Sequence, residues 1–284
     1  MKYLDRILIS HVPAKWMIVA RVIPIVAALF GAKLLVSLTD ADFITLTTLF
    51  GSIVAANVFL LGFLLAGTLA DYKESERLPG ELAASIESLA DECLITRKSK
   101  GTKETEDAVT YMAGFASLVR RWFYRQERTR TVMDRITGMN DIFLSFEPLT
   151  QPNFIVRMKQ EQATIRKILM RIDTIRDTSF VPAAYAIAEL ATALLIGGLL
   201  LTELGPLGEE IFYTVLPSFL MVYLILLIRD LDNPFNYSSK DAGAAEVSIK
   251  PVVDLDEKLS AQAAAIADNG GRTPAQGPAA HSGH

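Results

Sequence analysis

The chain has 284 residues, of which 51% are hydrophobic and 21% charged, and its mean hydropathy is +0.30. A soluble globular protein carries a similar share of charge but is rarely so apolar on average. These values exclude a disordered, collagen-like or disulfide-rich secreted protein, and the net charge of −4 gives no sign of nucleic-acid binding. The single cysteine, Cys93, is expected to be a small buried apolar side chain. We therefore expect a chain divided between lipid-facing segments and a substantial part that faces water.

Four stretches are apolar over the roughly 20 residues that a helix needs to cross a bilayer core. The first contains Arg21 and Lys33 and the third contains Glu189, whereas the second and fourth carry no charge. The predicted spans are 16–38, 43–70, 180–202 and 211–228.

Basic residues indicate the orientation of these spans. The connections 39–42 and 203–210 contain acidic residues but no lysine or arginine, whereas basic residues occur in 1–15, throughout 71–179 and directly after the fourth span. By the positive-inside rule both short connections face outwards. The sequence predicts a multi-pass protein of the plasma (inner) membrane, with a cytoplasmic N-terminal arm (1–15) and a cytoplasmic C-terminal tail.

The segment 71–179 is too long for a loop and shows helical periodicity without strand-like alternation. A helix is expected to open at Leu78-Pro79 and to end near Gly101. Further helices are predicted over 104–130 and 154–176, with a turn over 143–153. The chain is therefore predicted to be an all-α membrane protein with a helical cytoplasmic insert between the second and third spans.

The C-terminal tail, 229–284, is expected to be largely disordered. From about Asn236 it is rich in alanine, glycine, serine and proline. Such a composition buries too little apolar surface to fold. Only 255–267 is expected to form a short helix.

Motifs for chemistry are missing from the sequence. The three histidines form no metal-ligand pattern with the cysteine, and there is no phosphate-binding loop, dinucleotide fingerprint or nucleophile elbow. We therefore expect no catalytic residues, no metal and no cofactor, and the protein is predicted not to be an enzyme.

Charges inside spans are costly and call for partners. Arg21 and Glu189 lie at similar depths, so we expect an intramembrane ion pair between them. Lys33 lies near the outer end of its span and is expected to reach the surface, close to Asp40 or Asp42.

The strongest charge feature alternates arginines with aromatic residues from Arg120 to Arg130. Such a run can hold anionic lipid headgroups or anions. The alternative is a helix with a buried aromatic edge and a solvated arginine face.

One face of the second span has an unusual composition. Its outer part is hydroxylic, its middle aromatic and its inner part small, at helical spacing: Thr45, Thr48, Ser52, Ala56 (or Ala55), Phe59, Phe63, Ala66 and Ala70. Arranged around an axis, this face would form a wetted vestibule above a tight apolar collar, which can gate ions by dewetting. Ordinary helix packing is the alternative. Asn57 lies off this face and is expected to hydrogen-bond to a neighbouring span.

Three short motifs in order resemble the bestrophin family of ion channels. Phe59-Leu60-Leu61-Gly62-Phe63 resembles the neck signature on the family's pore helix, and Leu78-Pro79 resembles the leucine–proline that follows that helix. Asp232-Asn233-Pro234-Phe235 resembles the asparagine–proline–phenylalanine after the fourth span. The resemblance covers about residues 1–237.

The resemblance implies a homopentamer with one axial pore lined by the second span. Phe59, Gly62 and Phe63 would belong to the neck, with Ala55 or Ala56 at the third level in place of a bulky side chain. Thr45, Thr48 and Ser52 would line the vestibule. Animal bestrophins carry a calcium-clasping acidic run after this motif. This sequence lacks it, so calcium gating is not expected.

The expected function is a pentameric ion channel whose partners are copies of itself, membrane lipids and permeant inorganic ions. Anions such as chloride are the predicted cargo because this is the commoner behaviour in the family. The alternatives are a cation-selective channel of the same architecture, or a non-conducting scaffold or sensor whose cytoplasmic helices bind a partner. A secondary transporter is disfavoured because the spans show no inverted repeat.

Overall fold

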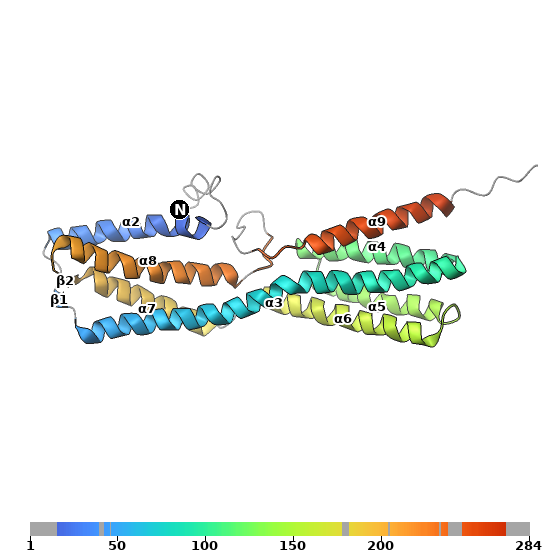
Figure 1. Cartoon of the computed structure of the whole chain (residues 1–284), viewed down its shortest axis with the longest axis horizontal. Coiled ribbons are helices and arrows are strands. Elements are labelled where there is room, and N and C mark those ends of the chain that lie inside the picture. The colour runs from blue at the N-terminus through green and yellow to red at the C-terminus, as the bar shows by residue number, and fades with distance from the viewer. Residues whose placement is uncertain are drawn as a thin grey trace, which may run out of the picture. The chain divides into compact units, whose positions relative to one another are not determined.

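The computed structural model describes residues 16–39, 43–45, 47–177, 182–203, 205–232, 234–237 and 246–270. These residues form helices and two strands of two residues each (Figure 1), so the prediction of an all-α chain is right apart from the strands. The elements divide into two compact units, which we call the membrane unit (Met1–Glu76 with Thr174–Val247) and the bundle unit (Arg77–Asp173 with Ser248–His284). Helix α3 contributes to both.

The membrane unit contains α2 (Met17–Leu38), the first part of α3 (Thr48–Lys100), α7 (Pro182–Leu200) and α8 (Leu207–Leu231). Each helix has a segment long and apolar enough to cross a membrane. These helices coincide with the predicted spans, although α3 begins five residues after Phe43 and α8 extends beyond 211–228 at both ends. Phe180 lies outside the described residues.

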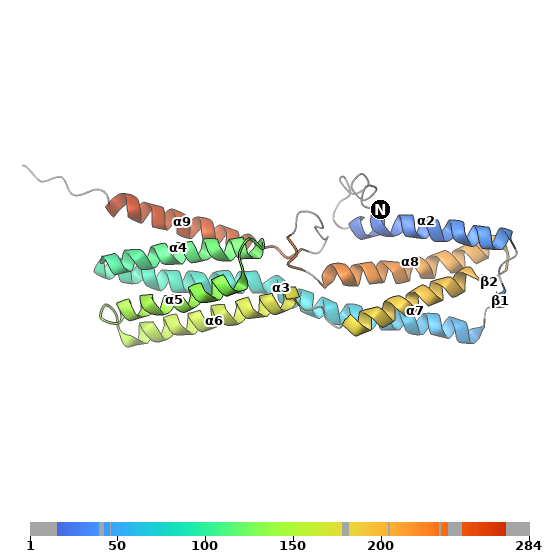
Figure 2. The same ribbon diagram turned by 180° about the vertical axis from the view of Figure 1, so that it is seen from behind.

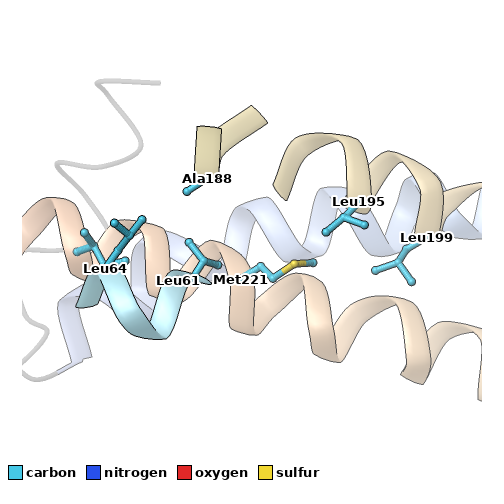
Figure 3. Close-up of a cluster of buried hydrophobic side chains, with 7 residues drawn as sticks. Leu61, Leu64, Ala188, Leu195, Leu199 and Met221 are labelled. Carbon is cyan, nitrogen blue, oxygen red and sulfur yellow. The ribbon is translucent and has the colours of Figure 1, made fainter. Parts of the chain in front are cut away.

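The core of the membrane unit is a cluster of apolar side chains on α3, α7 and α8 (Figure 3). Its buried members are Leu61, Leu64, Ala188, Leu195, Leu199, Met221 and Ile228. Helix α8 also packs against α2. The ring of Phe50 on α3 lies close to Gly198 on α7, and a Cβ added to Gly198 would lie 2.9 Å from this ring. Because glycine has no side chain, the two helices can approach each other at this point.

A two-stranded parallel sheet joins the connections at one end of the membrane unit. Strand β1 (Ile44–Thr45) pairs with β2 (Thr202–Glu203), with Ile44 opposite Thr202. The β1 strand leads into α3 and β2 follows α7, so the pairing fixes the start of α3 relative to the end of α7 (Figure 1).

The bundle unit contains the rest of α3 together with α4 (Lys103–Phe123), α5 (Thr129–Phe146), α6 (Pro152–Asp177) and α9 (Lys250–Gly270) (Figure 2). Its core holds Leu82, Ile86, Phe115, Trp122, Phe123 and Phe146, all at most 1% exposed. Cys93 is buried as predicted, and burial raises the pKa of its thiol to about 12.

Helix α3 runs without interruption through Leu78-Pro79, so the prediction of a new helix at this motif is wrong. Proline removes one backbone donor and crowds the preceding turn. Here Leu78, Leu82 and Ile86 are all buried on the same side of the helix, which compensates for the lost hydrogen bond. The predicted end near Gly101 is confirmed, since α3 stops at Lys100 and Gly101 has φ +59°.

The single helix predicted over 104–130 is two helices in the structure. Helix α4 ends at Phe123 and α5 begins at Thr129. Arg125 adopts a left-handed conformation with φ 57°, and the Arg125 N–H donates to the Trp122 carbonyl at 3.0 Å. The Gln126 N–H donates to the Arg121 carbonyl at 3.0 Å. These bonds form a Schellman motif, which ends a helix and is usually built with glycine.

The tail is more ordered than predicted. Residues Lys250–Gly270 form α9, which is longer than the expected 255–267 and packs along α4. Val252, Leu255, Leu259 and Ile266 are buried. Their spacing of three, four and seven residues places them on one face of a helix, and this face outweighs the alanine-rich composition around it.

Candidate functional site

The face of α3 that carries Phe59 and Phe63 points away from the rest of the chain. Phe59 is 77% exposed and Phe63 is 68% exposed, whereas Leu61 and Leu64 on the opposite face lie in the core. The two phenylalanines are four residues apart, so they lie one above the other along the helix. Two large aromatic rings therefore project from one helix and stay largely uncovered by the described residues.

Small side chains surround these rings. Ala55, Ala56 and Gly62 are all exposed on α3. Apart from the adjacent residues and the backbone of α3 itself, no described atom lies within 4 Å of a Cβ built on Gly62, so packing against the described residues gives no reason for a glycine there. All five residues predicted for the neck thus lie on the outward-facing surface of α3.

Two of the three predicted vestibule hydroxyls belong to α3. Thr48 is its first residue, and Ser52 donates a hydrogen bond to the Thr48 carbonyl at 2.9 Å. Thr45 lies in β1 instead, because the helix starts after it. Thr47 was overlooked at the sequence level: its side chain accepts a 3.2 Å hydrogen bond from the Phe50 N–H, which is the signature of a helix N-cap.

The predicted Arg21–Glu189 pair is wrong. Glu189 of α7 accepts two hydrogen bonds from Arg229 of α8, at 3.0 and 2.6 Å. Arg21 lies 3.9 Å from Asp230. Depth along a span can be read from the sequence, but the direction in which a side chain points depends on helix rotation, and Arg229 and Asp230 lie near the C-terminal end of the adjacent α8.

Lys33 does not reach the surface. Its Nζ lies 2.6 Å from Glu210 and donates to the Leu200 and Thr202 carbonyls at 3.2 and 2.8 Å. Both side chains are almost completely buried. The predicted partners Asp40 and Asp42 lie outside the described residues. This pair joins α2 to α8 and to the β2 strand.

Asn57 behaves as predicted. Its side-chain amide donates to the Thr192 hydroxyl of α7 at 2.9 Å and also contacts the sulfur of Met221 on α8 at 3.4 Å.

Thr68 and Tyr185 make a second α3–α7 contact, with their oxygens 3.3 Å apart. These polar contacts set the rotation of α3, because they hold Asn57 and Thr68 inward and so turn Phe59 and Phe63 outward.

The motif after the fourth span lies in a turn beyond α8. Phe235 is fully buried, and the Val247 N–H donates to the Pro234 carbonyl at 3.0 Å. The Tyr237 hydroxyl donates to the Val247 carbonyl at 2.7 Å. Asn233 lies outside the described residues. The motif thus anchors the segment that leads towards α9.

Metal-ligating side chains are dispersed in the described part of the chain. Within it, no three of its histidine, cysteine, aspartate and glutamate residues are grouped so that they could hold a metal ion.

Comparisons with known proteins give a match at the level of structure alone. No protein-family model matches the chain, and no curated protein sequence matches it significantly. A crystal structure of a point variant of a bacterial bestrophin homologue from Klebsiella pneumoniae is similar, with a TM-score of 0.64 and 15% identity over 88% of this chain and 99% of that chain. Another structure of the Klebsiella pneumoniae homologue gives a TM-score of 0.68 at 12% identity. The match covers 87% of this chain and 98% of that chain. A crystal structure described only as a membrane protein variant gives 0.69 at 13% identity, covering 86% and 98%.

The fold together with the four apolar helices defines the class of protein. The chain is a multi-pass membrane protein with the fold of bacterial bestrophin homologues. The resemblance inferred from the three short motifs is confirmed at the level of the fold.

Proposed function

We propose that the protein is an ion channel formed by five copies of the chain, with the outward face of α3 from each copy lining one axial pore. The observation that carries this proposal is the exposure of Phe59 and Phe63 on a helix whose other face is fixed to its own subunit. One chain with four spans cannot enclose a pore, so a closed symmetric ring is needed. The bestrophin-like fold supports the same assembly through the family resemblance.

In this ring Phe59 and Phe63 form an apolar neck. The wall of the neck is completed by Gly62 and by either Ala55 or Ala56. The wetted vestibule is formed by Thr48 and Ser52, with Thr45 at its mouth. A narrow collar without polar groups excludes water and so blocks ions until it widens. The alanine level lacks the third bulky ring of the family pattern, so this neck is wider at that level.

The proposed orientation places both termini and the bundle unit in the cytoplasm, in a plasma (inner) membrane. It follows from the acidic connections and the many basic residues of the bundle unit. Lipids surround the ring and inorganic ions pass through it. We propose anions as the permeant ions.

The channel is tested by reconstitution. We expect a ring of five chains in detergent by mass photometry and ion flux in liposomes. The double variant Phe59→Ala, Phe63→Ala should raise the flux, because smaller side chains let water fill the neck. Phe30→Ala with Phe212→Ala is the matched control, since these exposed phenylalanines lie on α2 and α8, and its flux should equal that of the wild type.

Two outcomes would contradict the channel. A monomer or dimer in both detergent and lipid would remove the pore, and a ring without flux in wild type and neck variant alike would favour the non-conducting scaffold. Selectivity is measured separately from the reversal potential in an asymmetric chloride salt. A potential near that of chloride supports anions, and one near that of the cation supports the cation-selective alternative.

A further inference from the structure

A depression of about 420 Å³ lies in the bundle unit between the C-terminal end of α4 and α9. Polar and charged side chains line it: Ser117, Arg120, Arg121, Tyr124, Gln126 and Asp256. It includes Arg120 and Arg121, the first two arginines of the run that the proposed channel function does not use.

The first arginine of this depression is held in place by a buried carboxylate. Asp256, 6% exposed, accepts hydrogen bonds from the Ser117 hydroxyl and, at 3.1 Å, from Arg120 Nη1. Arg121 donates through Nε to Glu127 at 3.3 Å. A guanidinium has five N–H donors, so each arginine keeps donors beyond its carboxylate contact while that contact fixes its position.

The turn that carries Gln126 adds further positive charge. Arg125 and Arg128 are exposed and form no ion pair within the described residues. Two guanidinium groups line the depression and two more lie in the turn beside it, against the two carboxylates of Asp256 and Glu127. This local excess of positive charge contrasts with the net charge of −4 of the chain.

Stabilisation of the helix end accounts for only part of this arrangement. Cations in the last turn complement the negative end of a helix, which explains Arg120 and Arg121. It does not explain Arg125, which occupies the left-handed position of the Schellman motif, where glycine adopts the conformation without cost. A strained residue beside a polar depression points to a role in binding.

We propose that this depression binds a phosphate group. Guanidinium forks match phosphate oxygens in bidentate geometry, and the Tyr124 hydroxyl and the Gln126 amide add polar groups to the lining. The phosphate belongs either to a small soluble molecule or to a lipid headgroup. The proposal does not depend on the channel function, because the site is complete within one bundle unit.

Binding is tested on the full-length protein in detergent, with inorganic pyrophosphate as the soluble probe and isothermal titration calorimetry at constant ionic strength. We expect saturable binding by the wild type and a loss of affinity of about tenfold or more in the double variant Arg120→Gln, Arg121→Gln, which removes the two guanidinium groups that line the depression. Arg130→Gln is the matched control, because Arg130 is exposed in the same region but lies outside the depression, and its affinity should be unchanged.

Retention of phosphatidic acid, measured by native mass spectrometry, distinguishes the two sources of phosphate. Selective retention by the wild type over the double variant identifies a headgroup, and pyrophosphate binding without such retention identifies a soluble ligand. Absence of saturable binding of both probes would overturn the proposal, as would equal binding by the double variant. Circular dichroism verifies that the variants keep their helices.

Discussion

Arg125 carries the clearest local strain among the described residues. It is the only non-glycine residue with positive φ in that part of the chain. A side chain in this conformation costs roughly 1–2 kcal/mol because Cβ approaches a carbonyl oxygen. Replacement by glycine removes this cost but also enlarges the conformational freedom of the unfolded chain.

Arg125→Gly is therefore expected to stabilise the bundle unit by about 0.5–1 kcal/mol. The measurement is the apparent melting temperature in detergent, followed by circular dichroism. Arg130→Gly, inside the first turn of α5 where glycine has a low helix propensity, is the control and should not stabilise. A melting temperature that falls in Arg125→Gly would show that the arginine side chain contributes more to folding than its backbone conformation costs.

The buried Lys33–Glu210 pair makes a second prediction at the scale of single residues. Lys33→Met leaves the carboxylate of Glu210 buried without its cation, which costs about 3–5 kcal/mol for pairs of this kind. The double variant Lys33→Met, Glu210→Leu removes both charges and should recover a large part of this loss.

The two variants are compared by thermal unfolding in the same detergent. If Lys33→Met melts at the wild-type temperature, the pair is not buried as described. If the double variant is no more stable than Lys33→Met, the lost stability comes from the Leu200 and Thr202 carbonyls that Lys33 also binds.

At the scale of elements, the contact between α3 and α7 depends on one glycine. A Cβ on Gly198 would lie 2.9 Å from Phe50 Cε2 and 3.1 Å from Cζ, so the ring must move. We expect Gly198→Ala to destabilise the membrane unit by about 1–3 kcal/mol. Gly197→Ala is the matched control, because nothing lies within 4 Å of its Cβ, and it should be neutral or slightly stabilising. Equal unfolding temperatures for the two variants would contradict this packing.

The spans were predictable because hydrocarbon thickness imposes a length and composition that a sequence displays directly. The inward position of Asn57 was predictable for a related reason, since a polar amide in a span needs a partner. Both predictions depend on local composition and spacing alone.

The ion pairs and helix ends were not predictable in the same way. Partner choice for Arg21 and Glu189 depends on how α7 and α8 are rotated. The break at Arg125 places arginine where glycine is the usual signal, and the continuity of α3 through Pro79 depends on burial of Leu78 and its neighbours. In each case tertiary packing overrides the local signal. The outward face of α3 was recognisable from its composition, but its exposure follows from the contacts of Asn57 and Thr68 with α7.

For the whole molecule, the bundle unit is assembled from two distant parts of the chain. Leu255 and Leu259 of α9 are buried where α9 packs along α4. Two ion pairs also hold α9: Asp256 pairs with Arg120 of α4, and Lys258 pairs with Glu87 of α3. Replacing both leucines by aspartate removes roughly 1.5–3 kcal/mol of apolar burial at each position. We expect α9 to separate from α4 and become sensitive to protease, while α4–α6 remain resistant.

The matched control is Ala261→Asp with Ala265→Asp, which places two charges at the same spacing on exposed positions of α9. Its protease pattern should equal that of the wild type. Equal resistance of α9 in both double variants would contradict the packing of α9 on α4.

The position of α9 in the chain has a consequence for synthesis. Helix α4 is complete at Phe123, but α9, which covers it, begins at Lys250, after α7 and α8. A ribosome that adds ~5–20 residues per second needs roughly 6–25 s for the intervening residues. During that interval α9 is not yet present to cover the apolar face of α4. Helices α7 and α8 must be synthesised before the bundle unit can be completed. Completion of the bundle unit is therefore ordered behind the synthesis of α7 and α8 in every newly made chain.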